Sequence, residues 1–190
     1  MIISTPPAET AEGHVAEMYA DDLSSDGFVF AHTRAMAVNP EAHAAFMALI
    51  AAIVPSIGIR VYEAATLGAA RAIGSPHCLL AHGRKSLRAE VLDDEALAAF
   101  AYRDDSGFTP AERAVVRYAE RLSSDPRSMT DADTGALRDA GFDDRQIVDI
   151  TLAAAARNYF SRALLALAVP TEDVPGLTPE TAAALRAAAL

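Results

Sequence analysis

The sequence is poor in the features that proteins use outside the cytoplasm. Its 190 residues include a single cysteine, Cys78, which excludes an internal disulfide. Residues 1–7 lack the basic segment and apolar run of a secretory signal. Charged residues such as Asp149 and Arg157 interrupt the long apolar stretch 147–169, and we expect no uninterrupted stretch of membrane-spanning length elsewhere. These absences predict a soluble, cytoplasmic protein.

Positive charge is also scarce. Lysine and arginine together number 16, against 26 aspartate and glutamate residues, so the formal net charge at pH 7 is -10. Nucleic acids and anionic membranes are bound by basic clusters, and we therefore expect neither as a partner. The one local basic group consists of Arg84, Lys85 and Arg88, and it is most simply a solvated helix face.

Alternating runs of β-branched residues are absent, whereas Ala, Leu, Glu and Arg, which favour helices, are abundant. The sequence therefore predicts an all-α fold. There is no internal repeat, low-complexity tract or clear boundary. We expect a single domain over residues 1–190, with N-terminal helices in 6–38, a core over 40–169 and a C-terminal helix in 178–190.

Capping residues and prolines mark where helices begin and end. Thr109-Pro110-Ala111-Glu112 has the pattern of a capping box, and Thr130 and Asp143 are expected N-caps. Pro55 is expected to follow the end of a helix, because proline lacks a backbone donor. The expected helices are 6–20, 28–38, 40–54, 59–73, 76–89, 94–102, 110–122, one after Thr130, one after Asp143, and 179–190.

The helix that follows Asp143 is apolar on nearly every side, including Ala153 to Ala156. A helix with this pattern is buried all round. Two interpretations stay open. Either the helix runs through the core of the chain, or another subunit of an oligomer covers its outer face.

Cys78 and His82 are the candidate reactive pair. Ser75 as N-cap and Pro76 as the first helical residue make Cys78 the third, where the helix dipole lowers the pKa of a thiol. His82 lies four residues further on and therefore on the same face. His77 points well away from His82, and we expect it to be an exposed residue of the helix start or to line the entrance to a site.

Glu63 lies in the mostly apolar helix 59–73, which we expect to fold back against the helix of Cys78. A carboxylate in apolar surroundings needs a partner. Glu63 could orient His82, which would accept the proton of Cys78 as in covalent catalysis. Alternatively, Glu63 pairs with Arg60 three residues earlier, and the cysteine and histidine are inert packing residues. The spacing leaves both interpretations open.

The pattern of Glu63, eleven residues, Ser75-Pro76-His77-Cys78, three residues and His82 resembles the carboxymuconolactone decarboxylase/AhpD-like family, especially its peroxidase-related branch. In that family the central motif is Cys-x-x-Cys. The resemblance covers residues 40–89, with a weaker likeness over 109–169. It implies an AhpD-like helical bundle, assembly into trimers or hexamers, and thiol-dependent reduction of hydroperoxides without a cofactor.

Ser75 stands where the family has its first cysteine, so an internal Cys–Cys cycle is impossible. Cys78 could still attack a hydroperoxide and form a sulfenic acid, which an external thiol or thiol protein would then resolve. Ser75 would cap the helix or donate a hydrogen bond to the thiolate, and His77 would support the site. The partners implied are a small hydroperoxide or lactone, a thiol and further copies of the chain.

Three alternatives to this redox function stay open. Glu63 and His82 could act as acid and base on a small carboxylated lactone, as in the family's decarboxylases, with Cys78 incidental. Cys78, His82 and Glu63 could instead hold a metal, although His77 cannot join His82 at one ion on a regular helix, and we expect no metal site. The chain could also be a binding protein that has lost the redox pair. We expect structural or surface roles for His14, His32 and His43.

Overall fold

The computed structural model describes all 190 residues, which form helices and no strand, and so confirms the predicted all-α class. Capping determines where most helices begin. The Ser75 hydroxyl accepts the Cys78 amide hydrogen, and complete capping boxes begin the helices after Thr109, Thr130 and Asp143. The α-helices are α1 (Gly13–Asp26), α2 (Ala31–Met36), α3 (Pro40–Ile73), α4 (Pro76–Arg88), α5 (Asp94–Ala101), α6 (Pro110–Ser124), α7 (Asp131–Asp139), α8 (Asp144–Ala166) and α9 (Pro179–Ala187).

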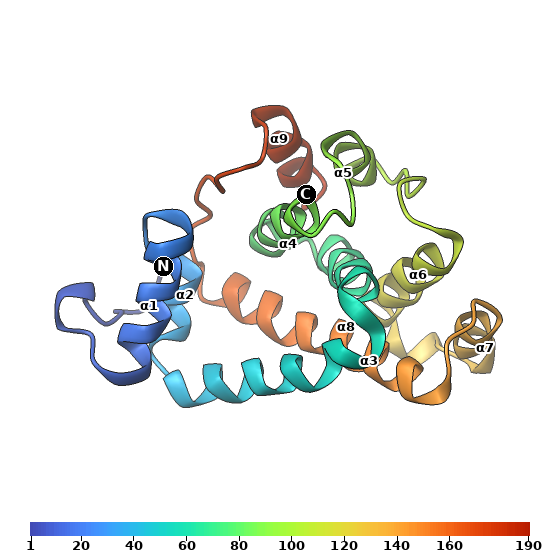
Figure 1. Cartoon of the computed structure of the whole chain (residues 1–190), viewed down its shortest axis with the longest axis horizontal. Helices are drawn as coiled ribbons and strands as arrows, with labels where there is room; N and C mark the ends of the chain where they lie inside the picture. The colour runs from blue at the N-terminus through green and yellow to red at the C-terminus, as the bar shows by residue number, and fades with distance from the viewer.

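The second half of α3 is the central element of the bundle (Figure 1). It packs against α4, α6 and α8, while α5 and α9 pack on each other and α9 covers α4. One hydrophobic core joins these helices, with Leu67, Leu79 and Leu97 fully buried. Helices α1 and α2 lie at one end of the molecule, beside the first half of α3, and have a small core of their own around Met18 and Tyr19.

Two predicted helix boundaries are wrong. The chain after Thr5 forms only a 3-10 turn at Ala8–Thr10, and α1 extends from Gly13 to Asp26. The Tyr19 hydroxyl donates a hydrogen bond to the Pro6 carbonyl and fixes the preceding segment against α1. Helix α3 does not end before Pro55 but continues to Gly58, whose φ of 76° and ψ of 163° break the helix.

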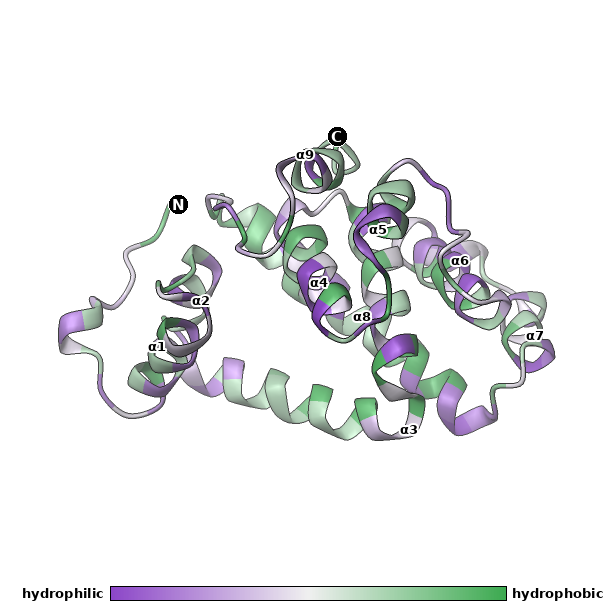
Figure 2. Ribbon diagram, turned by 45° about the horizontal axis from the view of Figure 1, so that its top comes forward, coloured by the Kyte–Doolittle hydropathy of each residue, from purple (hydrophilic) through white to green (hydrophobic).

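The first half of α3 exposes an apolar surface (Figure 2). An 18-residue window of α3 has a mean hydropathy of 2.0 and only 11% of it is buried, so by length and composition this helix could cross a membrane. The expectation that no such stretch exists is therefore wrong. On α8, Val148 and Tyr159 are 54% and 55% exposed, so α8 is not buried all round within one chain.

Gly68 determines how closely α3 and α6 approach each other. A Cβ at this position would lie 2.8 Å from the Val116 carbonyl oxygen of α6, which is backbone and cannot rotate away. We predict that Gly68→Ala lowers the free energy of unfolding by about 1–3 kcal/mol through overpacking. Gly135→Ala is the matched control: Gly135 is helical with open space around it, so the variant should gain up to about 1 kcal/mol. Urea unfolding of both variants tests this, and equal effects would contradict it.

Candidate functional site

Glu63 and His82 form a buried hydrogen-bonded pair between α3 and α4. The His82 Nδ1 and Glu63 Oε2 atoms are 2.7 Å apart, and the residues are 3% and 1% exposed. The break at Gly74, with φ of 72°, turns α4 back along α3 and brings the two side chains together. The alternative pairing of Glu63 with Arg60 does not occur, because Arg60 binds Glu112 at 2.7 Å.

Burial determines the protonation of this pair. It raises the pKa of Glu63 to about 7, against the opposing effect of Lys85 and Arg157. Burial, with the positive charge of Arg157 and Lys85, also lowers the pKa of His82 well below its usual value. We therefore assign a neutral His82. Near neutral pH, Glu63 exchanges one proton, and the His82 Nε2 makes no hydrogen bond with the protein.

Cys78 is 2% exposed and its sulfur has two polar neighbours, both from α8. The Ser161 hydroxyl donates to Sγ at 3.0 Å, and Arg157 Nη1 donates at 3.5 Å. The expected hydrogen bond between Cys78 and His82 is absent. Ser75 is fully buried and serves as the N-cap, so the hydroxyl at the sulfur is that of Ser161 instead.

Arg157 is a buried cation without a carboxylate partner. It is 5% exposed, its Nη1 contacts Cys78, its Nη2 lies 3.4 Å from the Tyr62 hydroxyl, and its Nε has no acceptor. Burial works to lower the pKa of Arg157, but the adjacent Cys78 sulfur and Tyr62 hydroxyl outweigh it and raise the pKa. A charge buried in this way requires a counter-charge, and the thiolate of Cys78 is the nearest candidate.

A cavity of about 670 Å³ adjoins these residues. Helices α1 and α2 cover one side, and α3, α4 and α8 form the others. Its lining includes Cys78, His82 and Arg157, apolar side chains such as Phe46 and Ile50, and the carboxylates of Asp21 and Asp22 from α1. The site can therefore hold a small organic molecule with its reactive group at the sulfur.

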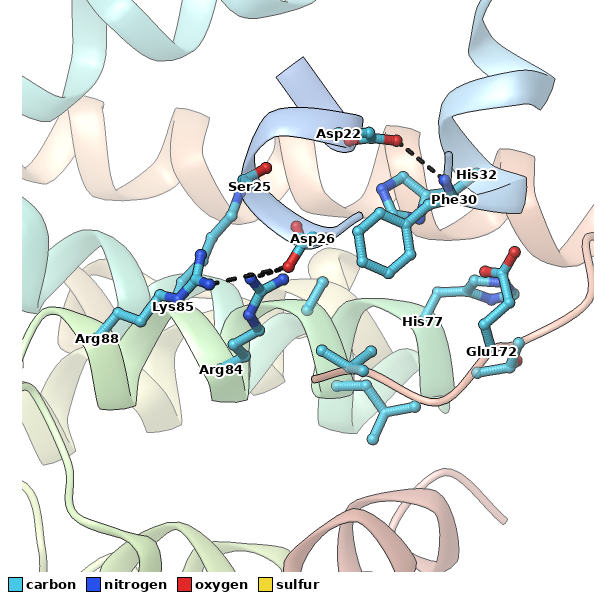
Figure 3. Close-up of a pocket in the computed structure, with 14 residues that line it drawn as sticks. Asp22, Ser25, Asp26, Phe30, His32, His77, Arg84, Lys85, Arg88 and Glu172 are labelled. Atoms are coloured by element: carbon cyan, nitrogen blue, oxygen red, sulfur yellow. Dashed lines mark hydrogen bonds and ion pairs between the residues drawn. The ribbon is translucent and has the colours of Figure 1, made fainter. Parts of the chain in front are cut away.

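Lys85 and Arg88 of α4 are exposed, as expected for a solvated helix face, whereas Arg84 is buried and His77 lines both the cavity and a smaller one beside it. His77 is 8% exposed and its Nε2 binds the Pro170 carbonyl at 2.8 Å. Arg84 is buried in an ion pair with Asp26 of α1, which ties α1 to α4 (Figure 3). Lys85 lines both the large cavity and an adjoining one of about 220 Å³.

The three remaining histidines also line the large cavity, where the sequence predicted surface or structural roles. His14 and His43 approach to 3.4 Å, and His32 lies edge-on to His77. Burial, with smaller effects of His77 and Lys85, lowers the pKa of His32 to about 3, so it is neutral. No group of three His, Cys, Asp or Glu side chains is arranged to hold a metal ion.

Sequence reasoning missed Arg157, Ser161 and Tyr62. The available signal was Arg157 itself, because it is a charged residue in the middle of an apolar helix. Burying such a charge is costly unless it has a partner in the interior. Its partner could not be inferred, because 79 residues separate Arg157 from Cys78.

Comparison with solved structures defines the fold. An AhpD-core, peroxidase-related protein from Ralstonia eutropha JMP134 has a TM-score of 0.77 at 20% identity over 97% of this chain and 96% of that one. A peroxidase-related protein from Silicibacter sp. TM1040 has a TM-score of 0.78 at 22% identity, over 93% of this chain and 94% of that one. The debrominase Bmp8 was solved as a cysteine-to-alanine variant in complex with 2,3,4-tribromopyrrole. It has a TM-score of 0.73 at 20% identity, over 95% of this chain and 94% of that one. The chain is thus an all-helical protein with an AhpD-like fold.

The sequence model of the carboxymuconolactone decarboxylase family matches residues 40–121, which include Glu63, Ser75, Cys78 and His82. This match confirms the family resemblance expected from the sequence. No curated protein matches the chain by sequence.

Glu63→Gln should change how stability depends on pH. Because the folded pKa of about 7 exceeds the usual 4.5, the folded protein retains a proton that the unfolded chain releases between these values. Relative to Glu63→Gln, the wild type should therefore lose up to about 3 kcal/mol of unfolding free energy as the pH rises through this window. Urea unfolding at pH 5 and pH 8 measures the difference.

Glu112→Gln is the control, because Glu112 should change the pH dependence of the unfolding free energy in the opposite direction. Burial raises the pKa of Glu112, but hydrogen bonds from Arg60 and Thr109 lower it further, to below its usual value. The stability that ionised Glu112 contributes is present above its unfolded pKa and is lost as the pH falls through its folded one. A pH-independent difference between the wild type and Glu63→Gln would contradict the buried-carboxyl assignment.

Proposed function

We propose that the chain is a thiol-dependent hydroperoxide reductase in which Cys78 is the nucleophile. The observation that carries the proposal is the guanidinium of Arg157, buried without a carboxylate and within 3.5 Å of the only sulfur. Arg157, the Ser161 hydroxyl and the N-terminus of α4 would all stabilise the thiolate. The fold resemblance to peroxidase-related proteins supports the same chemistry.

The Cys78 thiolate attacks one oxygen of a hydroperoxide, and the O–O bond breaks. The sulfur is oxidised to a sulfenic acid, and the hydroperoxide is reduced to an alkoxide, which takes up a proton to become an alcohol. The Glu63–His82 pair supplies that proton, because Glu63 carries one near neutral pH. A thiol then condenses with the sulfenic acid and releases water. A second thiol regenerates Cys78 and leaves as a disulfide.

Arg157→Met is predicted to slow oxidation of Cys78 at pH 7 by about tenfold or more, because the thiolate loses the positive charge beside it. One equivalent of cumene hydroperoxide is added, and intact mass reports the gain of one oxygen atom. Arg157→Lys should restore part of the rate. Arg162→Met is the control, since Arg162 is exposed on the same helix. Oxidation of Arg157→Met at the wild-type rate and pH profile would refute the thiolate role of Arg157.

Acid–base decarboxylation of a small lactone is the second candidate function. The observation that favours it is the Glu63–His82 pair beside the cavity, with a carboxyl that titrates near neutral pH. Cys78→Ser separates the two candidates. It should abolish hydroperoxide turnover but leave most decarboxylation intact, whereas Glu63→Gln should abolish decarboxylation. A binding protein without catalysis would show neither activity.

We also propose that the chain forms homo-oligomers, trimers or hexamers, in the cytoplasm. The support is the exposed apolar surface along the first half of α3 and the outer side of α8, which includes Met47, Leu152 and Tyr159. Monomeric soluble proteins rarely expose contiguous apolar patches larger than a few hundred Å². A second copy that covers this surface would also cover Met47 and Ile59, which line the cavity.

Tyr159→Glu should dissociate the oligomer, because it places a charge in the proposed interface. The matched control is Tyr102→Glu, since Tyr102 is 75% exposed and follows α5, away from α3 and α8. Sedimentation velocity measures the mass of each. If the wild type sediments as a monomer, the proposal is contradicted. If the wild-type monomer also pellets with anionic lipid vesicles, the apolar surface belongs to a membrane contact instead.

A further inference from the structure

Tyr62 lines the part of the large cavity that lies beside the sulfur. It shares this lining with Cys78, His82 and Arg157, and the residue is 6% exposed. Its ring is edge-on to that of His82, with the ring centroids 6.1 Å apart and the ring planes inclined at 65°. A small molecule that occupies this part of the cavity therefore meets the phenol, the imidazole and the sulfur together.

The hydrogen of the Tyr62 hydroxyl has no acceptor on the protein. The one hydrogen bond of this hydroxyl is with Arg157 Nη2, at 3.4 Å. A guanidinium can only donate, so the phenolic oxygen is the acceptor and its own hydrogen stays free. Buried donors normally have a partner, because leaving one unpaired is costly. The free hydrogen therefore indicates an acceptor on a bound molecule.

Arg157 holds the hydroxyl and the sulfur in a fixed relation. Its Nη1 donates to Cys78 Sγ at 3.5 Å and its Nη2 donates to Tyr62, so one planar group contacts both. A hydrogen bond from a cation polarises the phenol, and the phenolic O–H is then a stronger donor. A molecule attacked by the sulfur thus has a strengthened donor close to the reacting atoms.

The sulfur already has a hydroxyl donor of its own. Ser161 donates to Sγ at 3.0 Å, and no hydrogen bond joins Tyr62 to Cys78. When a thiolate attacks a hydroperoxide, the sulfur carries negative charge before the reaction, whereas the departing oxygen gains it during the reaction. A donor that is free in the resting site suits the departing oxygen, since it then interacts with charge that forms only in the transition state.

We propose that Tyr62 is a catalytic residue whose hydroxyl donates a hydrogen bond to the departing oxygen of the hydroperoxide. This proposal rests on the proposed function, since it concerns the same reaction. The Cys78 sulfur bonds to one oxygen and the O–O bond breaks, so the sulfur is oxidised to a sulfenic acid and the departing oxygen is reduced. His82 Nε2 gives that oxygen a proton, and His82 Nδ1 takes the proton of Glu63. Tyr62 keeps its own proton throughout.

The test compares two peroxides whose departing oxygens differ in basicity. The compound tert-butyl hydroperoxide expels a strongly basic alkoxide, whereas peracetic acid expels the stable acetate ion. Each is added to the reduced full-length protein at pH 7, and intact mass follows the gain of one oxygen at the single cysteine. Tyr62→Phe should slow the reaction with tert-butyl hydroperoxide about 10- to 100-fold, as expected for a lost hydrogen bond to a charged group. With peracetic acid the loss should be about twofold or less, because acetate needs little stabilisation.

Two controls separate this role from an effect on the sulfur itself. Iodoacetamide alkylates Cys78 with loss of iodide, so no oxygen departs, and Tyr62→Phe should react with it at the wild-type rate and with the wild-type pH profile. Tyr118→Phe is the matched variant, because Tyr118 is a buried tyrosine of α6 whose hydroxyl pairs with Thr151 at 2.8 Å, outside the cavity lining. Tyr118→Phe should be oxidised like the wild type by both peroxides.

A wild-type rate of Tyr62→Phe with tert-butyl hydroperoxide would overturn the proposal. Equal slowing with both peroxides, whether or not alkylation also slows, would overturn it too, because the effect would not depend on the departing oxygen. Failure of the proposed function looks different: iodoacetamide alkylates wild-type Cys78, but neither peroxide oxidises it, and the role of Tyr62 is then refuted as well.

Discussion

A positive charge buried beside a thiol is the constraint on which the rest of this site depends. Placing Arg157 in the interior without a carboxylate is costly, and the cost is offset only if a negative charge forms next to it. The sulfur of Cys78 can supply that charge as a thiolate. The site is organised around this sulfur, and α8, which contributes both Arg157 and Ser161, is as much a part of it as α4.

The Glu63–His82 pair is not hydrogen-bonded to the sulfur, in contrast to what the spacing suggests. Burial brings the Glu63 carboxyl to the pH range in which it can give up or take a proton. In the proposed reaction, thiolate stabilisation and proton delivery are thus divided between Arg157 and the Glu63–His82 pair, which line the same cavity. This division suits a reaction in which the nucleophile must stay ionised while the leaving oxygen acquires a proton.

The N-terminal helices α1 and α2 cover one side of the cavity beside Cys78, His82 and Arg157. Helices α1 and α2 have only a small core of their own and are joined to the bundle by contacts such as the Asp26–Arg84 ion pair. They contribute one wall of the cavity beside the sulfur. The exposed apolar residues Met47 and Ile59 of α3 also line the cavity, so a partner that covered them would restrict access to it.

Local patterns in the sequence determined the helices, their caps and the approach of Glu63 to His82, because each depends on residues close together in the chain. Ser75 caps α4, the boxes at Thr109, Thr130 and Asp143 begin three further helices, and a short break at Gly74 folds α4 onto α3. The site residues Glu63, Cys78 and His82 were all named from their spacing, although their catalytic roles remain a proposal. Only the tertiary structure decided what surrounds the sulfur. Arg157 and Ser161 reach it from a helix 79 and 83 residues away, and burial, which no local pattern reports, sets the protonation of Glu63.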